Sequence, residues 1–119
     1  MSTERLRGWP DVYLKLMPEY SCDMPLWGTI DWEEDLSLSP ELLDRLATWQ
    51  LQFDSNFHHE DGWIDTAERD ASVRHADALV SDLRREVPVD VPLVVDLWPI
   101  EDSKPRWKFW ARRGPIVYR

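Results

Sequence analysis

The chain has 119 residues, of which 43% are hydrophobic and 31% are charged, and its formal net charge is −9. The length fits one domain over residues 1–119, and the composition is that of a folded globule rather than of a disordered acidic tail. The negative charge opposes binding to nucleic acid or to a membrane surface, and no run approaches the ~18 apolar residues of a membrane span.

Short strands are predicted before the first helix. In residues 11–17 apolar side chains alternate along the chain, which is typical of a strand with one face turned inward. The inward residues are Val12, Leu14 and Leu16. Pro18 ends this segment, and residues 24–30 have room for a second short strand.

Two helices are predicted in the middle of the chain. Ser39, Pro40 and Glu41 combine an N-cap serine, a first-turn proline and an early carboxylate, which indicates a helix over residues 40–57. Its apolar stripe has helical spacing and consists of Leu42, Leu46, Trp49, Phe53 and Phe57. After a polar turn around Gly62, a second helix is expected over residues 66–86. Its apolar line is Val73, Ala76, Leu79, Val80, Leu83 and Val87.

Strands are predicted again in the last part of the chain. Residues 93–98 are a short apolar run typical of a central strand, and Pro99 ends it. A further strand is expected over residues 107–111 and an edge strand over residues 116–118. The order strand, helix, helix, strand, strand predicts an α+β fold, in which two helices pack on one face of a small sheet of three to five strands.

Charge is distributed unevenly along the chain. Residues 16–68 contain 13 carboxylates and one basic residue, Arg45, which gives a local net charge of −12. Residues 103–119 contain six basic residues and no acidic one. We expect the acidic region to attract and steer a basic protein partner.

Two acidic segments, each with a tryptophan, flank the first predicted helix. The first acidic segment consists of Asp31, Trp32, Glu33, Glu34 and Asp35. The second acidic segment contains Glu60, Asp61, Trp63 and Asp65. A helix of about 18 residues separates them, so they should lie ~27 Å apart. A run of like charge is most often a solvated loop, but a ring surrounded by carboxylates also suits an interface with a basic protein.

No motif for catalysis or metal binding is evident. Cys22 is the single cysteine, and Asp23 beside it would raise the thiol pKa rather than activate a nucleophile. The run HHED at residues 58–61 sits at a helix end, where adjacent side chains rarely converge on one metal ion. Four unclustered glycines argue against a phosphate-binding loop. We therefore expect neither catalysis nor a metal or other cofactor.

The run RWKFWARR at residues 106–113 mixes aromatic and basic residues, as proteins that bind single-stranded nucleic acid do. The simpler interpretation is a strand whose alternate aromatic residues are core and whose cations face solvent or the chain's own carboxylates. The net charge of −9 favours this interpretation, so we predict no nucleic-acid partner.

A compact, cysteine-poor, tryptophan-rich acidic chain of this length resembles the immunity proteins of bacterial polymorphic-toxin and contact-dependent growth inhibition systems. The similar elements are the two acidic segments, with Trp32 and Trp63 inside them. The resemblance implies that the chain covers the active site or substrate groove of a basic toxin domain, such as a nuclease, with carboxylates. The basic C-terminal run departs from what a nuclease decoy needs.

The sequence therefore predicts an immunity protein or antitoxin, monomeric or weakly dimeric, that binds a basic toxin domain through its two acidic segments. No apolar stretch follows the first arginines, so we expect no secretory signal and a cytoplasmic location. The alternative is a small regulatory or accessory subunit that recognises a host protein or a small ligand through a tryptophan-lined surface.

Overall fold

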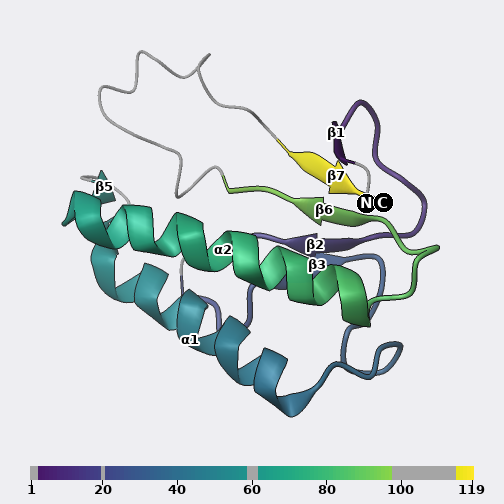
Figure 1. The fold of residues 1–119 in the computed structure, drawn as a ribbon, viewed down its shortest axis with the longest axis horizontal. Coiled ribbons are helices and arrows are strands. Elements are labelled where there is room, and N and C mark those ends of the chain that lie inside the picture. The colour runs from purple at the N-terminus through teal and green to yellow at the C-terminus, as the bar shows by residue number, and fades with distance from the viewer. Residues whose placement is uncertain (1–2, 20, 59–61, 98–114) are drawn as a thin grey trace.

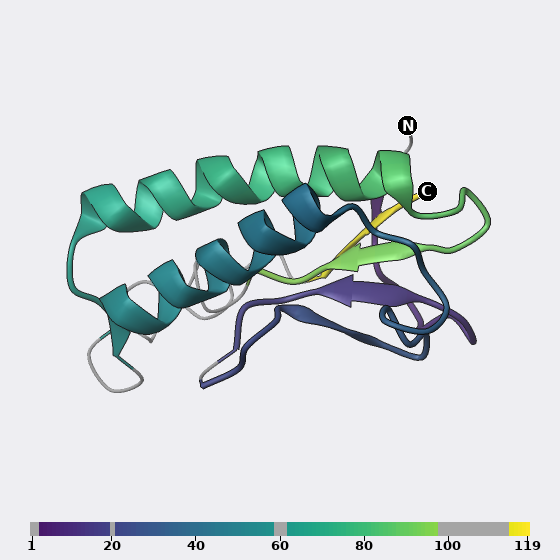
Figure 2. The same cartoon turned by 90° about the horizontal axis from the view of Figure 1, so that it is seen from below.

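The structure is a computed structural model that describes residues 3–19, 21–58, 62–97 and 115–119. Two helices lie side by side and cover one face of a five-stranded sheet, and a separate two-stranded hairpin lies at one end of the helical layer (Figures 1 and 2). This α+β arrangement confirms the predicted fold class. Among the described residues, neither helix is apolar enough over a sufficient length to cross a bilayer.

The main sheet is mixed. Its strands are β1 (Thr3–Arg5), β2 (Leu14–Leu16), β3 (Leu26–Gly28), β6 (Leu93–Val95) and β7 (Ile116–Tyr118). They lie in the order β1-β7-β6-β2-β3, and β2 and β6 run parallel while the other neighbours are antiparallel. A parallel pair needs a long crossover connection, and the two helices belong to it.

Both helices begin where the sequence predicts. Helix α1 (Pro40–Asn56) is capped by Ser39, whose hydroxyl accepts a hydrogen bond from the backbone N–H of Leu42 at 3.3 Å. Helix α2 (Thr66–Glu86) is capped by Asp65, whose carboxylate accepts from the N–H of Ala67 at 2.8 Å. Each cap satisfies one of the N–H groups that the first turn of a helix leaves without a partner.

The core lies between the helices and the sheet. All five residues of the predicted α1 stripe are buried, and in α2 the line of Ala76, Leu79, Val80, Leu83 and Val87 is buried as well, whereas Val73 is half-buried. The sheet contributes five buried side chains to this core, Leu14, Leu16, Leu26, Leu93 and Val95. Val94 and Val117, at most 1% exposed, are buried as well. Trp49 is 2% exposed, and its indole N–H donates to the carbonyl of Ser72 at 3.0 Å, which joins the two helices.

Several details differ from the sequence prediction. The strand expected over residues 11–17 is shorter, and Val12, expected inside, is 51% exposed because it precedes β2. β7 was expected at an edge, but β1 pairs with its outer side and makes it an interior strand. The turn between the helices is closed by a hairpin of β4 (Phe57–His58) and β5 (Gly62–Trp63). The strand expected over residues 107–111 lies outside the described residues.

Gly28 ends β3 in a conformation that requires glycine. Its φ is +120°, and a Cβ atom at this position would lie 2.5 Å from the carbonyl oxygen of Tyr13. That same oxygen accepts hydrogen bonds from the N–H groups of Thr29 and Ile30. The chain therefore folds tightly against β2 before it enters the first acidic segment.

Candidate functional site

The first acidic segment forms a closed turn. The N–H of Asp35 donates to the carbonyl of Asp31 at 2.8 Å, and the N–H of Asp31 donates to the carboxylate of Asp35 at 3.1 Å. The other carboxylate, that of Asp31, accepts from the N–H groups of Glu33 at 3.0 Å and Glu34 at 3.3 Å. Asp31 and Asp35 thus hold the backbone of the turn, while the side chains of Glu33 and Glu34 are exposed to solvent.

The sequence predicts Trp32 as an anchor in an interface, but its side chain is only partly accessible to solvent. It is half-buried, and its ring packs against the hydrophobic core. Its neighbours Glu33 and Glu34 are exposed on the same turn. Trp32 therefore fixes the acidic turn onto the domain as well as bordering its surface.

The turn lies beside the junction of the two helices. Glu86, the last residue of α2, accepts hydrogen bonds from both the N–H of Ser39 at 2.7 Å and its hydroxyl at 2.8 Å. A carboxylate near the positive end of the α1 dipole is electrostatically favourable. Glu41 and Asp44, both exposed on the first turns of α1, extend the negative surface from the acidic turn along that helix.

The second acidic segment is only partly described, since Glu60 and Asp61 lie outside the described residues. Trp63 is half-buried, and its ring meets Phe53 and Phe57 edge to face at centroid distances of 5.9 Å and 6.0 Å. Its indole nitrogen is buried and has no hydrogen-bond partner among the residues that the structure describes. Asp65 is the α2 cap.

The apolar side chain that the second segment exposes is Ile64, which is 68% exposed. No sequence signal distinguishes it from Trp63, because which of two adjacent side chains faces inward depends on the β4–β5 hairpin. The burial of Trp63 against α1 leaves Ile64 on the outside.

The structure does not bring the two acidic segments together. The first precedes the N-terminus of α1 and the second follows its C-terminus, so they lie at opposite ends of the helical layer (Figure 2). Seventeen helical residues correspond to ~25 Å along the axis. The predicted arrangement, in which the segments bracket one helix, is therefore present.

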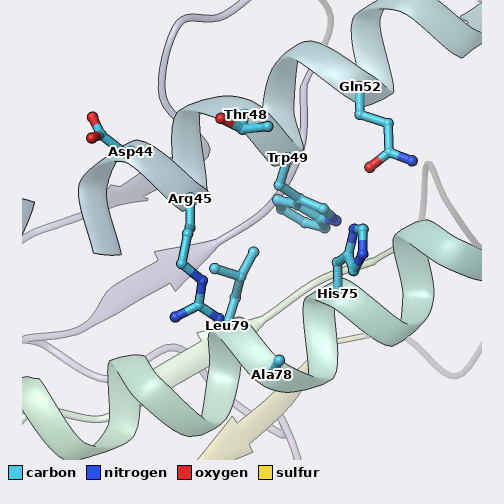
Figure 3. Close-up of a pocket in the computed structure, with 8 residues that line it drawn as sticks. All are labelled: Asp44, Arg45, Thr48, Trp49, Gln52, His75, Ala78 and Leu79. Carbon is cyan, nitrogen blue, oxygen red and sulfur yellow. The ribbon is translucent and has the colours of Figure 1, made fainter. Parts of the chain in front are cut away.

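A groove that sequence reasoning missed lies between the helices on the side away from the sheet (Figure 3). It has a volume of about 300 Å³ and is lined by Asp44, Arg45, Thr48, Trp49 and Gln52 of α1 and by His75, Ala78 and Leu79 of α2. The helical spacing of these residues is visible in the sequence. Their convergence depends on the crossing of two helices, which the sequence alone does not specify.

A second missed feature is a set of exposed aromatic residues near β2 and β3. Trp9 is 53% exposed and Trp27 is 37% exposed. Lys15 pairs with Trp27 across the strands and lies 5.2 Å from the centre of the Trp9 ring, a cation–π contact. Because Leu14 and Leu16 face the helices, the Lys15 side chain lies on the opposite face of the sheet.

Cys22 lies in surroundings that suppress its reactivity. Burial of the thiol, with the carboxylates of Glu19, Asp54 and Asp23 as further causes, raises the pKa of Cys22. A thiol with a raised pKa is mostly protonated at neutral pH and is a poor nucleophile. In the described part of the chain, no three or more histidine, cysteine, aspartate or glutamate side chains gather as a metal site would need.

Comparison with known protein families places the chain beside bacterial immunity proteins. The family model described as CdiI_serr, Serratia CdiI immunity protein-like, matches residues 12–95. This range runs from the approach to β2 through both helices to the end of β6, and it covers well over half of the chain. Searches among curated proteins and among solved structures returned no match.

Proposed function

The chain belongs to the Serratia CdiI immunity protein-like family, and we propose that it neutralises its toxin by covering a basic surface of the toxin domain with the two acidic segments. The observation that carries this proposal is the first acidic segment. Its backbone is closed by four hydrogen bonds, and the turn presents Glu33 and Glu34 to solvent. A pre-formed turn loses less conformational entropy on binding than a flexible acidic loop would.

Approach of the toxin is the first step of the proposed mechanism. Residues 16–68 carry a local net charge of −12, which raises the encounter rate of a basic partner through long-range attraction. A toxin that cleaves nucleic acid needs a positively charged substrate groove, so a nuclease is the class of toxin that this charge fits best.

Docking is the second step. Glu33 and Glu34 pair with Lys or Arg side chains of the toxin, while Asp31 and Asp35 add charge and keep the turn closed. The solvent-facing edge of Trp32 packs beside these pairs. At the other end of α1, Trp63 and Asp65, together with Glu60 and Asp61, form the second contact. Neutralisation by coverage requires no covalent step and no cofactor.

Co-expression tests this function directly. The C-terminal domain encoded by the gene immediately upstream is induced in a bacterial host alone, with this chain, or with an unrelated acidic protein of similar size. We expect growth arrest in the first and third cultures and normal growth in the second. If this chain fails to restore growth while the domain remains toxic, the immunity role in that pairing is refuted.

The mode of neutralisation is tested on the complex. If coverage is the mechanism, toxin separated from the complex under denaturing conditions and refolded regains its full activity. If free toxin regains activity after the same procedure while toxin from the complex stays inactive, this chain has modified it chemically, and the non-catalytic mechanism is wrong. The accessory-subunit alternative predicts that the chain binds a host protein or a small ligand with little dependence on salt.

A further inference from the structure

We infer that the groove between α1 and α2 is a further contact in the same complex and that it receives one aromatic side chain projecting from the basic surface of the toxin domain. This inference rests on the proposed function. It assigns a role to a concave site that lies outside both acidic segments (Figure 3).

The size of the groove favours a single side chain. Two polar contacts join the helices beside it: the guanidinium of Arg45 pairs with Asp82, and the amide of Gln52 donates to Glu68 at 3.0 Å. Arg45 and Gln52 are two helical turns apart, or ~10 Å along α1. A space of this length and about 300 Å³ is too small for a peptide helix and suits one large side chain.

The lining favours a neutral ring over a cation. Figure 3 shows Trp49, His75 and Leu79 converging between the helices, whereas the carboxylate of Asp44 points away from them. Asp82 already pairs with both Arg45 and Arg85, so an incoming cation would meet two arginines near one end. Trp49 and Leu79, each 2% exposed, form only the floor of the groove. An aromatic ring would instead contact the exposed imidazole of His75 and the guanidinium of Arg45, and ring–ring and cation–π contacts stabilise beyond simple area burial.

Charge complementarity identifies the partner that carries this ring. Asp44 lies at the rim of the groove, five residues after the Ser39 cap, or ~7.5 Å along the axis. Glu41 and the acidic turn continue the negative surface from there. Asp82 pairs with both arginines, and the border formed by Asp44, Glu41 and the acidic turn is negative, so it complements a basic surface around the inserted ring, the property proposed for the toxin domain. Buried aromatic anchors surrounded by polar contacts are typical of the strongest contacts in protein interfaces.

A filled groove tests the inference. Ala78 is exposed and lines the groove, so Ala78→Trp places an indole in it without changing the net charge. Thr48→Trp fills the groove from α1 and serves as a second variant if Ala78→Trp does not fold. Ser81→Trp is the matched control, because Ser81 is exposed on the same helix and does not line the groove. Each variant is checked by circular dichroism and thermal unfolding before use.

The affinity of each variant for the toxin domain from the upstream gene is measured by calorimetry. We expect Ala78→Trp and Thr48→Trp to weaken binding at least tenfold and Ser81→Trp to change it less than threefold. If folded groove-filling variants bind within threefold of the natural chain, the groove is outside the interface and the inference is wrong, although the proposed function stands. If the natural chain does not bind the toxin domain at all, the proposed function fails as well.

Discussion

Asp31, Asp35 and Asp65 each accept a backbone hydrogen bond, whereas Glu33 and Glu34 lie exposed on the same turn as the first two. Replacing one of the three aspartates therefore removes a charge and also weakens a turn or a helix cap. Caps of this kind contribute about 1 kcal/mol to the free energy of unfolding. Weaker binding by such a variant could therefore result from a folding defect rather than from the lost charge. Glu33 and Glu34 are the positions at which the charge of the first segment can be changed alone.

The segment around Cys22 is held by a buried amide. Gln50 is 1% exposed, donates to the carbonyl of Glu19 at 2.6 Å and accepts from its N–H at 3.2 Å. Asp54, one turn along α1, accepts from the N–H of Ser21 at 3.0 Å. These contacts keep the Cys22 thiol near the carboxylates of Glu19 and Asp54, which are among the causes of its raised pKa.

This raised pKa predicts a measurable pH dependence. Alkylation by iodoacetamide proceeds through the thiolate, so a higher pKa in the folded chain lowers the reactive fraction at any given pH. We expect the rate–pH profile of the folded chain, recorded over about pH 7–10, to lie at higher pH than that of the same chain unfolded in urea. Coincident profiles, or a folded profile at lower pH, would show that the native surroundings do not disfavour the thiolate.

At the scale of elements, the junction of the helices depends on a few polar contacts. The Ser39 hydroxyl accepts from the first turn of α1 and donates to Glu86 at the end of α2. The cap of one helix is thus also the contact that fixes the other. Because only three residues separate the acidic turn from Ser39, its position relative to α2 depends on the same pair.

Ser39→Ala removes both contacts of the hydroxyl. We expect the free energy of unfolding to fall by about 1 kcal/mol, the usual effect of losing a serine cap. Ser37→Ala is the control, since Ser37 is exposed and precedes the helix, and we expect it to change stability by less than about 0.5 kcal/mol. Urea denaturation measures both variants, and equal midpoints for the two would contradict a capping role for Ser39.

The helices were predictable from sequence because their signals are local. A cap, a first-turn proline and an apolar stripe of period 3.6 all lie within residues 39–57. β1, by contrast, is Thr3–Arg5, three polar residues whose pairing with β7 joins the two ends of the chain. No apolar alternation marks such a strand, and only long-range pairing turns β7 from an edge strand into an interior one.

In the candidate site, too, only the features that depend on local sequence were predictable. The positions of the two acidic segments at opposite ends of α1 follow from the sequence, because both flank one helix. The burial of Trp63 and the exposure of Ile64 depend on a hairpin of two-residue strands, which is too short to leave a pattern. The groove requires two helices to cross, so it belongs to tertiary structure alone.

For the whole molecule, the remaining question is whether net charge or its placement brings the toxin to the chain. Glu33→Gln with Glu34→Gln changes the net charge from −9 to −7 within the first acidic segment. Asp70→Asn with Asp77→Asn makes the same change on exposed positions of α2. Both double variants weaken the long-range attraction to a basic partner by the same two charges. A difference between their association rates therefore shows which of the two locations lies near the contact.

We expect the glutamate pair to slow association with the toxin domain about three- to tenfold at low salt, and the aspartate pair to slow it less. Stopped-flow measurements of the association rate, repeated at increasing salt, check this. Salt shortens the screening distance from about 10 Å at 0.1 M to about 3 Å at 1 M, so the rates of all variants should converge. Equal slowing by both pairs would place the first acidic segment outside the interface. No slowing by either pair would refute steering. In each case the exposed carboxylates of the turn would have no specific part in the encounter.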